Sequence, residues 1–308
     1  MSPIVHHFPV LGDEVVKYVV KNRGGIYIDA TFGGGGHSKF ILDILSEEGR
    51  LIAFDIDNEA IERGKKLEEE DKRFKIVKCN FADIDKYLSE NNIGKVDGIV
   101  FDLGLSTFQL LSNKRGFSFK EENAFLDMRM NTDSQYTAAE VLNYSSRNHL
   151  NHIFKRYGEI NNPSKLINNI SIFRKQYGSI STIGDFLDII NESWDGRVDF
   201  NKFVRQCFQA VRIEVNRELD VLEKALDSLQ RIVKPQGVVA IVTFHSLEDE
   251  KVRAWKKKLC DDIQIQDYAQ NFVNQFSFVT NACVFPTELE KSINWASRSA
   301  KLWVAQKN

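Results

Sequence analysis

The sequence has few cysteines, few prolines and no long apolar run. Its four cysteines, Cys79, Cys207, Cys260 and Cys283, lie far apart and form no C-x-x-C pair. This spacing argues against a zinc ribbon and a disulfide framework and favours buried free thiols. No stretch approaches the roughly 18 apolar residues that a membrane span needs, and no signal-peptide pattern opens the chain. We expect a cytoplasmic protein, or one inside an organelle after loss of a short leader.

A strong net charge is also lacking. Lysine and arginine number 41 against 43 aspartates and glutamates, and the formal net charge is −2. This balance argues against a uniformly basic surface for binding nucleic acid. Any RNA contact must then use local patches, of which residues 251–258 (KVRAWKKK) are the densest. In isolation, such a run is more often a solvated helix face.

Short apolar runs alternate with helical patterns in the first third of the chain. This alternation is typical of βα units that build a parallel sheet, and it predicts a Rossmann-like α/β domain. The predicted strands are residues 25–29, 51–55, 74–78 and 96–102.

After Asp102 the alternation stops, and residues 112–205 become helical, asparagine-rich and free of convincing strands. We predict an inserted all-helical subdomain there, so the α/β domain comprises residues 1–111 and 206–308. From Phe208 to Ile232, apolar residues recur at steps of three and four, which predicts one long amphipathic helix. Pro235 and Gly237 are predicted to end it. Further strands are expected at residues 238–244, 276–285 and 301–306.

The strongest local motif is DATFGGGGH at residues 29–37, between the first predicted strand and a helix expected at 38–45. Ligands of such sheets bind beyond the carboxyl ends of the strands, where glycines let the backbone approach them. A flexible turn is the alternative, although four contiguous glycines are costly to order. Asp55, nineteen residues past Gly36, can accept hydrogen bonds from the ribose hydroxyls of an adenosine. The glycines lack the G-x-G-x-x-G order that suits a pyrophosphate, which favours S-adenosylmethionine (SAM) over NAD.

Three further residues follow predicted strands. Phe81 can lie against an adenine ring, although a lone Phe near a strand end is more often core. Asp102 opens a Gly-containing loop (DLGLS) that can present oxygens to an exocyclic amine, or it caps a turn. His245 lies in VAIVTFHSLED (239–249) and can bind substrate, shuttle a proton or orient the loop.

Several segments together resemble the MraW family, the ribosomal RNA small subunit methyltransferase H enzymes. The resemblance covers nearly the whole chain, and its motifs occur in the same order as in the family. These motifs are HHFPVLGDE, YIDATFGGGGHS, FDID, DLGLSTFQL, RGFSF, LDMRM, TAAEVLN, FQAVRIEVNREL and FHSLED. It implies a class I SAM-dependent methyltransferase fold with an inserted cytidine-recognition subdomain. The implied reaction is methylation of the N4 amino group of a decoding-centre cytidine, usually numbered 1402, in 16S rRNA of the small ribosomal subunit.

The resemblance also implies site residues. SAM would be bound by Gly34, Gly35, Gly36, His37, Asp55, Phe81, Asp102 and Gln109. Asp102 and His245 are the candidate catalytic residues, and Asp102 serves either the amino-acid end of SAM or the cytosine amine. We expect no metal and no covalent enzyme intermediate, and the oligomeric state stays open between monomer and homodimer.

Other functions remain alternatives at this point. The glycines and Asp55 alone fit an NAD-dependent dehydrogenase, and a ribosome assembly factor could keep the fold as a docking surface. An amine methyltransferase that acts on DNA is a closer alternative. For an RNA substrate, the candidates to stack on a flipped base are Phe108, Phe117 and Phe119. The candidates to contact phosphates, or to form ordinary ion pairs, are Arg115, Arg129, Arg212 and Arg217.

Overall fold

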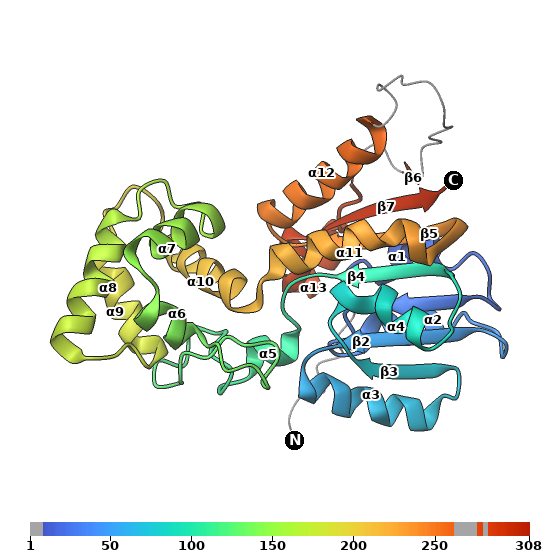
Figure 1. Ribbon diagram of the computed structural model, residues 1–308, viewed down its shortest axis with the longest axis horizontal. Helices are drawn as coiled ribbons and strands as arrows, with labels where there is room; N and C mark the ends of the chain where they lie inside the picture. The colour runs from blue at the N-terminus through green and yellow to red at the C-terminus, as the bar shows by residue number, and fades with distance from the viewer. Residues whose placement is uncertain (1–8, 262–275, 280–282) are drawn as a thin grey trace. The chain divides into compact units, whose positions relative to one another are not determined.

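The chain forms two compact units (Figure 1). The computed structural model describes residues 9–261, 276–279 and 283–308. Unit 1 comprises residues Met1–Gly104 and Leu219–Asn308, and unit 2 comprises Leu105–Glu218. The predicted insertion, residues 112–205, lies within unit 2. Among the described residues, no helix has the length and apolar character that crossing a membrane requires.

Unit 1 is built on one sheet, in which the described residues form seven strands in the order β3-β2-β1-β4-β5-β7-β6. The first five strands pair in parallel, while β7 is antiparallel to both β5 and β6. The predicted Rossmann-like α/β domain with a mostly parallel sheet is therefore confirmed. The strands are β1 (Ile26–Asp29), β2 (Arg50–Asp55), β3 (Phe74–Lys78), β4 (Val96–Asp102), β5 (Val233–Thr243), β6 (Phe276–Phe278) and β7 (Lys301–Lys307).

Helices cover both faces of this sheet. Along β5, Val238, Ala240 and Val242 belong to the core cluster that includes residues of α1, α2 and α3, whereas Val239 and Ile241 belong to the cluster that includes residues of α4, α11 and α12. Alternate residues of a strand point to opposite faces, so both faces of β5 are buried. The helices of this part are α1 (Gly12–Val19), α2 (Gly36–Leu42), α3 (Asn58–Glu70), η1 (Phe81–Asp83), α4 (Ile84–Glu90), α11 (Glu218–Ile232), α12 (Ser246–Asp261), α13 (Glu288–Ile293) and η3 (Trp295–Ser299).

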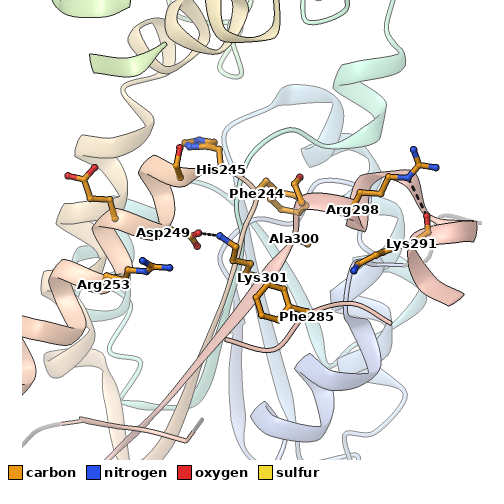
Figure 2. Close-up of a pocket in the computed structure, with 12 residues that line it drawn as sticks. Phe244, His245, Asp249, Arg253, Phe285, Lys291, Arg298, Ala300 and Lys301 are labelled. Atoms are coloured by element: carbon orange, nitrogen blue, oxygen red, sulfur yellow. Dashed lines mark hydrogen bonds and ion pairs between the residues drawn. The ribbon is translucent and has the colours of Figure 1, made fainter. Parts of the chain in front are cut away.

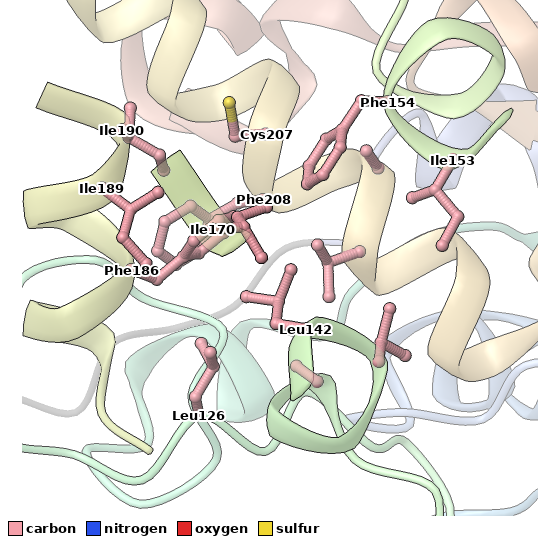
Figure 3. Packing of buried hydrophobic residues seen from close by; sticks show 14 of the residues in the cluster. Leu126, Leu142, Ile153, Phe154, Ile170, Phe186, Ile189, Ile190, Cys207 and Phe208 are labelled. Atoms are coloured by element: carbon pink, nitrogen blue, oxygen red, sulfur yellow. The ribbon is translucent and has the colours of Figure 1, made fainter. Parts of the chain in front are cut away.

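Unit 2 is helical and has its own hydrophobic core, part of which Figure 3 shows. All of its residues are described, and its only β-type pairing is an isolated bridge between Phe125 and Thr182. The core includes Leu142, Phe186 and Phe208, all of them buried. The helices are α5 (Thr107–Leu111), α6 (Ala138–Tyr144), α7 (Arg147–His152), the π-helix η2 (Ile153–Tyr157), α8 (Ser164–Tyr177), α9 (Ile183–Ser193) and α10 (Phe200–Asn216).

The single long helix expected from Phe208 to Ile232 is wrong. The chain forms two helices there, α10 and α11, separated by Arg217 in the left-handed conformation (φ 51°). Asn216, the last residue of α10, accepts a hydrogen bond from the Met130 backbone N–H (2.7 Å) and donates one to the Met128 carbonyl (2.8 Å). These contacts with a distant loop hold the chain where it turns.

Two predicted boundaries near the C-terminal strands also need correction. Pro235 and Gly237 do not end a helix, because β5 already begins at Val233 and its register against β4 shifts between Val233 and Val238. Of the strand expected at 276–285, β6 forms only at Phe276–Phe278. Val284 makes an isolated bridge with Leu302, and residues 280–282 lie outside the described part.

The cysteines behave as free thiols where their side chains are described. Cys207 is fully buried in unit 2, where burial raises the pKa of its thiol, while Cys79 and Cys283 are partly buried. The side chain of Cys260 lies outside the described part of the chain.

Candidate functional site

Three aspartates lie at one edge of the sheet in unit 1. Strands β2, β1 and β4 are parallel neighbours, and Asp29, Asp55 and Asp102 are their last residues. The carboxyl ends of parallel strands form the ligand-binding edge of such sheets. The structure therefore places two predicted site residues, Asp55 and Asp102, at the edge where a nucleoside cofactor is expected.

The glycine-rich loop between β1 and α2 begins at this edge. Gly33 and Gly35 have positive φ angles of 52° and 79°, which residues with a Cβ adopt at a cost. A Cβ on Gly35 would also lie only 2.8 Å from the ring of Phe32. Gly34 is exposed and carries no side chain that could cover the edge. The loop conformation thus depends on glycine and leaves room for a ligand.

A buried polar cluster connects the ends of β1 and β4. His37, from the first turn of α2, donates from Nε2 to the Val10 carbonyl (3.0 Å), and its Nδ1 lies 3.4 Å from Asp102 Oδ2. Asp29 accepts a hydrogen bond from Ser38 Oγ at 2.6 Å. Thr31 Oγ1 accepts the backbone N–H of Asp102 at 2.7 Å. Asp102 is therefore positioned through both its side chain and its backbone.

The charges in this cluster shift two pKa values. Burial raises the pKa of Asp29, although the nearby His37 and the Ser38 hydroxyl oppose the rise. Burial alone would lower the pKa of His37, but the charge and hydrogen bond of Asp102, with the charge of Asp29, raise it overall. A protonated His37 can donate from both ring nitrogens, to Val10 and to Asp102.

Asp102 has one carboxylate oxygen without a partner. Oδ2 faces His37, whereas Oδ1 is buried and accepts no hydrogen bond from the described residues. A buried acceptor left without a donor is costly, so such an atom is a candidate for ligand binding.

Asp55 holds the opposite side of the glycine loop. Its Oδ2 accepts the Gly33 N–H at 2.7 Å, and its Oδ1 accepts the N–H groups of Ile56 (2.8 Å) and Asp57 (2.9 Å). Burial raises the pKa of Asp55 to about 6, although these hydrogen bonds oppose the rise. The side chain is partly exposed, so its remaining lone pairs can accept ribose hydroxyls.

Two of the predicted cofactor-binding residues have structural contacts of their own. Phe81 is partly buried and meets Phe101 edge to face at 5.7 Å, in agreement with a core contribution. Gln109 belongs to unit 2, and its side chain accepts the Ser106 N–H (3.0 Å) in a capping box at the start of α5. Their roles in cofactor binding stay predictions.

His245 follows β5 in unit 1 and precedes α12. Its Nδ1 accepts the backbone N–H of Glu248 at 3.4 Å, which places the proton of a neutral imidazole on Nε2. That Nε2 is buried, lies 3.2 Å from Glu248 Oε1, and makes no hydrogen bond with the described residues. Within the described part of the chain, Nε2 thus has a carboxylate neighbour in Glu248 but makes no hydrogen bond.

Comparison with known proteins identifies the family. Residues 4–308 match the MraW methylase family. The chain belongs to the MraW methylase family. Its relatives include a protein of Caldicellulosiruptor saccharolyticus that is 40% identical, over 98% of this chain and 99% of that protein. A relative from Karelsulcia muelleri is 38% identical over 98% of each chain, and one from Bacteroides fragilis is 39% identical over 98% of this chain and 97% of that protein. All three relatives are named ribosomal RNA small subunit methyltransferase H.

Membership of this family confirms several predictions. The protein is a methyltransferase, its cofactor is SAM, and its fold is the class I SAM-dependent methyltransferase fold. The dehydrogenase alternative is therefore wrong.

The residues of unit 1 fit this cofactor. Asp102 Oδ1 offers an acceptor for an ammonium group, and Asp55 offers a carboxylate for ribose hydroxyls. Gly34 has no side chain, so the glycine loop leaves room for the cofactor between Asp102 and Asp55. Thr31 and Ser38, which the sequence interpretation did not single out, hold Asp102 and Asp29 in place. Their hydroxyls beside a buried strand end were the signal that could have indicated them.

The candidate RNA contacts in unit 2 take part in interactions within the protein. Arg115 donates to the carbonyls of Arg129 and Met130. Arg129 is paired with Asp127 at 2.6 Å, and Arg212 with Glu218 at 2.8 Å. Arg217 is exposed at the turn between α10 and α11.

The three aromatic candidates in unit 2 also differ in accessibility. Phe117 is buried, and Phe119 is partly buried and packs edge to face on Phe208 at 5.8 Å. Phe108 is the exposed member of the three, with 44% of its surface accessible. Phe108 therefore remains the best candidate among them for stacking on a base.

Proposed function

We propose that the protein methylates the N4 amino group of a cytidine in the decoding centre of 16S rRNA, the one usually numbered 1402, in the small ribosomal subunit. The relatives named ribosomal RNA small subunit methyltransferase H, similar over nearly the full length of both chains, support an rRNA substrate. The observation that carries the amine chemistry is the buried, unpartnered Oδ1 of Asp102. The proposal includes a cytoplasmic location, where small ribosomal subunits are found.

Asp102 suits the methylation of an exocyclic amine. The lone pair of such an amine is delocalised into the ring, so the nitrogen is a weak nucleophile. An acceptor that receives a hydrogen bond from one N–H of the amine increases the electron density on its nitrogen. Asp102 Oδ1 is such an acceptor, and His37 and Thr31 fix its position. The same oxygen can instead bind the amino-acid end of SAM.

His245 would contribute a hydrogen-bond donor. With Nδ1 occupied by the Glu248 N–H, the Nε2–H can donate to a carbonyl or phosphate oxygen of the substrate. It is a positioning role, because a nitrogen that already carries a proton cannot accept one from the amine. The enzyme then supplies placement and polar complementarity, while SAM supplies the electrophilic methyl group.

The roles of unit 2 and of the remaining site residues belong to the same proposal. Residues 112–205 would recognise the cytidine and its RNA surroundings. Gly34, Gly35, Gly36, His37, Asp55, Phe81, Asp102 and Gln109 would bind SAM.

The decisive experiment uses small ribosomal subunits that lack the modification. The purified protein is incubated with them and SAM, the rRNA is digested, and the nucleosides are analysed by mass spectrometry. We expect 4-methylated cytidine at one position with the wild-type protein and none with Asp102→Ala. A folded wild-type protein that binds SAM but yields no methylated cytidine contradicts the proposal.

A second arm tests the alternative of a non-catalytic assembly factor. Cells lacking the chromosomal copy receive either the wild type or Asp102→Ala, and growth and ribosome profiles are compared. A non-catalytic factor predicts equal rescue by both proteins, whereas our proposal predicts that only the wild type restores the modification. Duplex DNA offered in place of ribosomal subunits should remain unmethylated.

A further inference from the structure

A cavity in unit 1 is lined in part by His245, and its other lining residues have no role in the function proposed above. Its volume is about 570 Å³, and it lies where β5 ends and β7 begins. Figure 2 shows that Arg253 of α12 and Lys291 of α13 point toward it from opposite sides. Phe244 and Phe285 also line it. The cavity thus combines cationic groups with aromatic faces.

Cationic side chains outnumber acidic ones in the lining of the cavity, which has Arg253, Lys291, Arg298 and Lys301 against Asp249 and Glu250. Lys301 forms an ion pair with Asp249, which also accepts hydrogen bonds from Thr243 (2.6 Å) and from the indole of Trp303 (3.1 Å). Burial alone would raise the pKa of Asp249, but these hydrogen bonds lower it overall, so the carboxylate stays ionised. Asp249 is therefore fully engaged by its own unit.

The guanidinium of Arg253 stacks on an aromatic ring. Its guanidinium carbon lies over the ring of Trp303, 5.7 Å from the ring centroid. Stacking on an aromatic ring orients a guanidinium without neutralising it. On the other side, Lys291 pairs with Glu288, whose side chain is 90% exposed. An exposed pair of this kind contributes little and is readily exchanged for another anion.

The basic residues of the run 251–258 have two different kinds of surroundings. Lys251 pairs with Glu223 and Lys258 pairs with Asp227, so these two lysines hold α12 to α11. Arg253 is the member of the run that lines the cavity. The run is thus neither a uniform RNA-binding patch nor only a solvated face.

The aromatic part of the cavity is accessible. Phe285 exposes 57% of its surface, so its ring is open to a ligand. Single-stranded nucleic acids are bound by this combination, with bases stacked on aromatic rings and phosphates held by cations.

We propose that this cavity binds a nucleotide of the substrate RNA near the methylated one, with its phosphate between Arg253 and Lys291 and its base against Phe285. The inference rests on the proposed function, because it requires an RNA substrate. A nucleotide anchored here would lie beside His245, which also lines the cavity. The cavity would thereby fix the RNA strand on one side of the reacting base.

The test compares two cavity variants, Arg253→Gln/Lys291→Gln and Phe285→Ala, with Lys257→Gln as control. Lys257 is exposed, belongs to the same basic run and does not line the cavity. Binding to unmodified small ribosomal subunits is measured over a range of KCl concentrations. SAM affinity, kcat and the KM for subunits are measured for the same proteins.

For the double variant we expect weaker subunit binding and a shallower salt dependence. The slope of log K against log salt should fall by roughly 0.7 for each single-strand phosphate that the variant no longer binds. For Phe285→Ala we expect binding about 5- to 150-fold weaker, the usual effect of removing a stacked ring. In both variants the KM for subunits should rise, while SAM affinity and kcat at saturating subunits stay at the control level.

The outcomes separate this inference from the proposed function. If the wild type yields methylated cytidine but both cavity variants match Lys257→Gln in affinity, salt slope and KM, the cavity proposal is wrong and the function stands. If the variants lose SAM binding instead, the cavity supports the cofactor site and the proposal is also wrong. If the wild type does not methylate subunits at all, it is the proposed function that fails.

Discussion

At the scale of single residues, Asp102 divides its two carboxylate oxygens between different surroundings. Oδ2 faces a histidine whose pKa is raised, and Oδ1 is buried and accepts no hydrogen bond from any residue that the structure describes. The sequence indicated both Asp102 and His37 from their positions after buried strands. It could not show that they meet, because they lie 65 positions apart with two strands between them. The pairing follows from the neighbouring positions of β1 and β4.

Replacing Asp102 should separate its two candidate roles. Asp102→Asn keeps the shape but removes the negative charge, and we expect kcat to fall by on the order of 10²-fold, as for other preorganised polar groups. Single-turnover rates and equilibrium SAM binding are measured with Asp43→Asn, an exposed site, as control. A slow rate with unchanged SAM affinity assigns Asp102 to the amine, and a matching loss of affinity assigns it to SAM. Full activity of Asp102→Asn would contradict both roles.

SAM binding should depend on pH through Asp55. Burial raises the pKa of this carboxyl to about 6, so it is ionised above that pH and protonated below it. An ionised carboxylate is the better acceptor for ribose hydroxyls. We therefore expect SAM affinity to be constant well above pH 6 and to fall by up to about tenfold per unit below it.

Calorimetric titration with SAM between pH 5 and 8 measures this dependence. Asp55→Asn should bind more weakly at pH 8 and lose this part of the pH dependence. His37, whose pKa is also raised, remains in that variant and accounts for any residual slope. An unchanged pH profile in Asp55→Asn would show that Asp55 does not contact the cofactor.

At the scale of secondary structure, local patterns predicted what local contacts decide. The predicted bounds of β3 and β4 are those of the structure, because short apolar runs between turns leave few alternatives. The break between α10 and α11 was missed, since Asn216 binds a loop more than 80 residues earlier. No local pattern carries that information. The cavity was missed for the same reason, as its lining comes from the residues after β5 and from α12, α13, η3 and β7.

The helices of unit 2 depend on capping residues, which gives an element-level prediction. Thr182 caps α9 by accepting the Asp185 N–H at 3.1 Å, and Asp185 Oδ2 accepts the Thr182 N–H at 2.8 Å. Thr182→Ala should lower the free energy of unfolding by about 0.5–2 kcal/mol. Thr182→Ser keeps the hydroxyl and should stay close to the wild type. Urea denaturation followed by circular dichroism compares them, and equal losses in both variants would exclude the capping bond as the cause.

At the scale of the whole molecule, the two units have separate hydrophobic cores. The clusters on the two faces of the sheet contain only residues of unit 1, and the third cluster contains only residues of unit 2. Separate cores allow separate stabilities, because the packing of one does not require the other. A ligand bound mainly by unit 1 should then stabilise mainly unit 1.

Hydrogen exchange in the presence of SAM tests this separation. At a SAM concentration one hundred times its Kd, the bound unit gains about 2.7 kcal/mol against unfolding. We expect slower exchange of amides in β1, β2 and β4, and unchanged exchange in α8 and α9, whose buried residues belong to the core of unit 2. Asp55→Asn at the same SAM concentration is the control and should show a smaller effect. Equal protection of both units would mean that they unfold as one cooperative body, despite their separate cores.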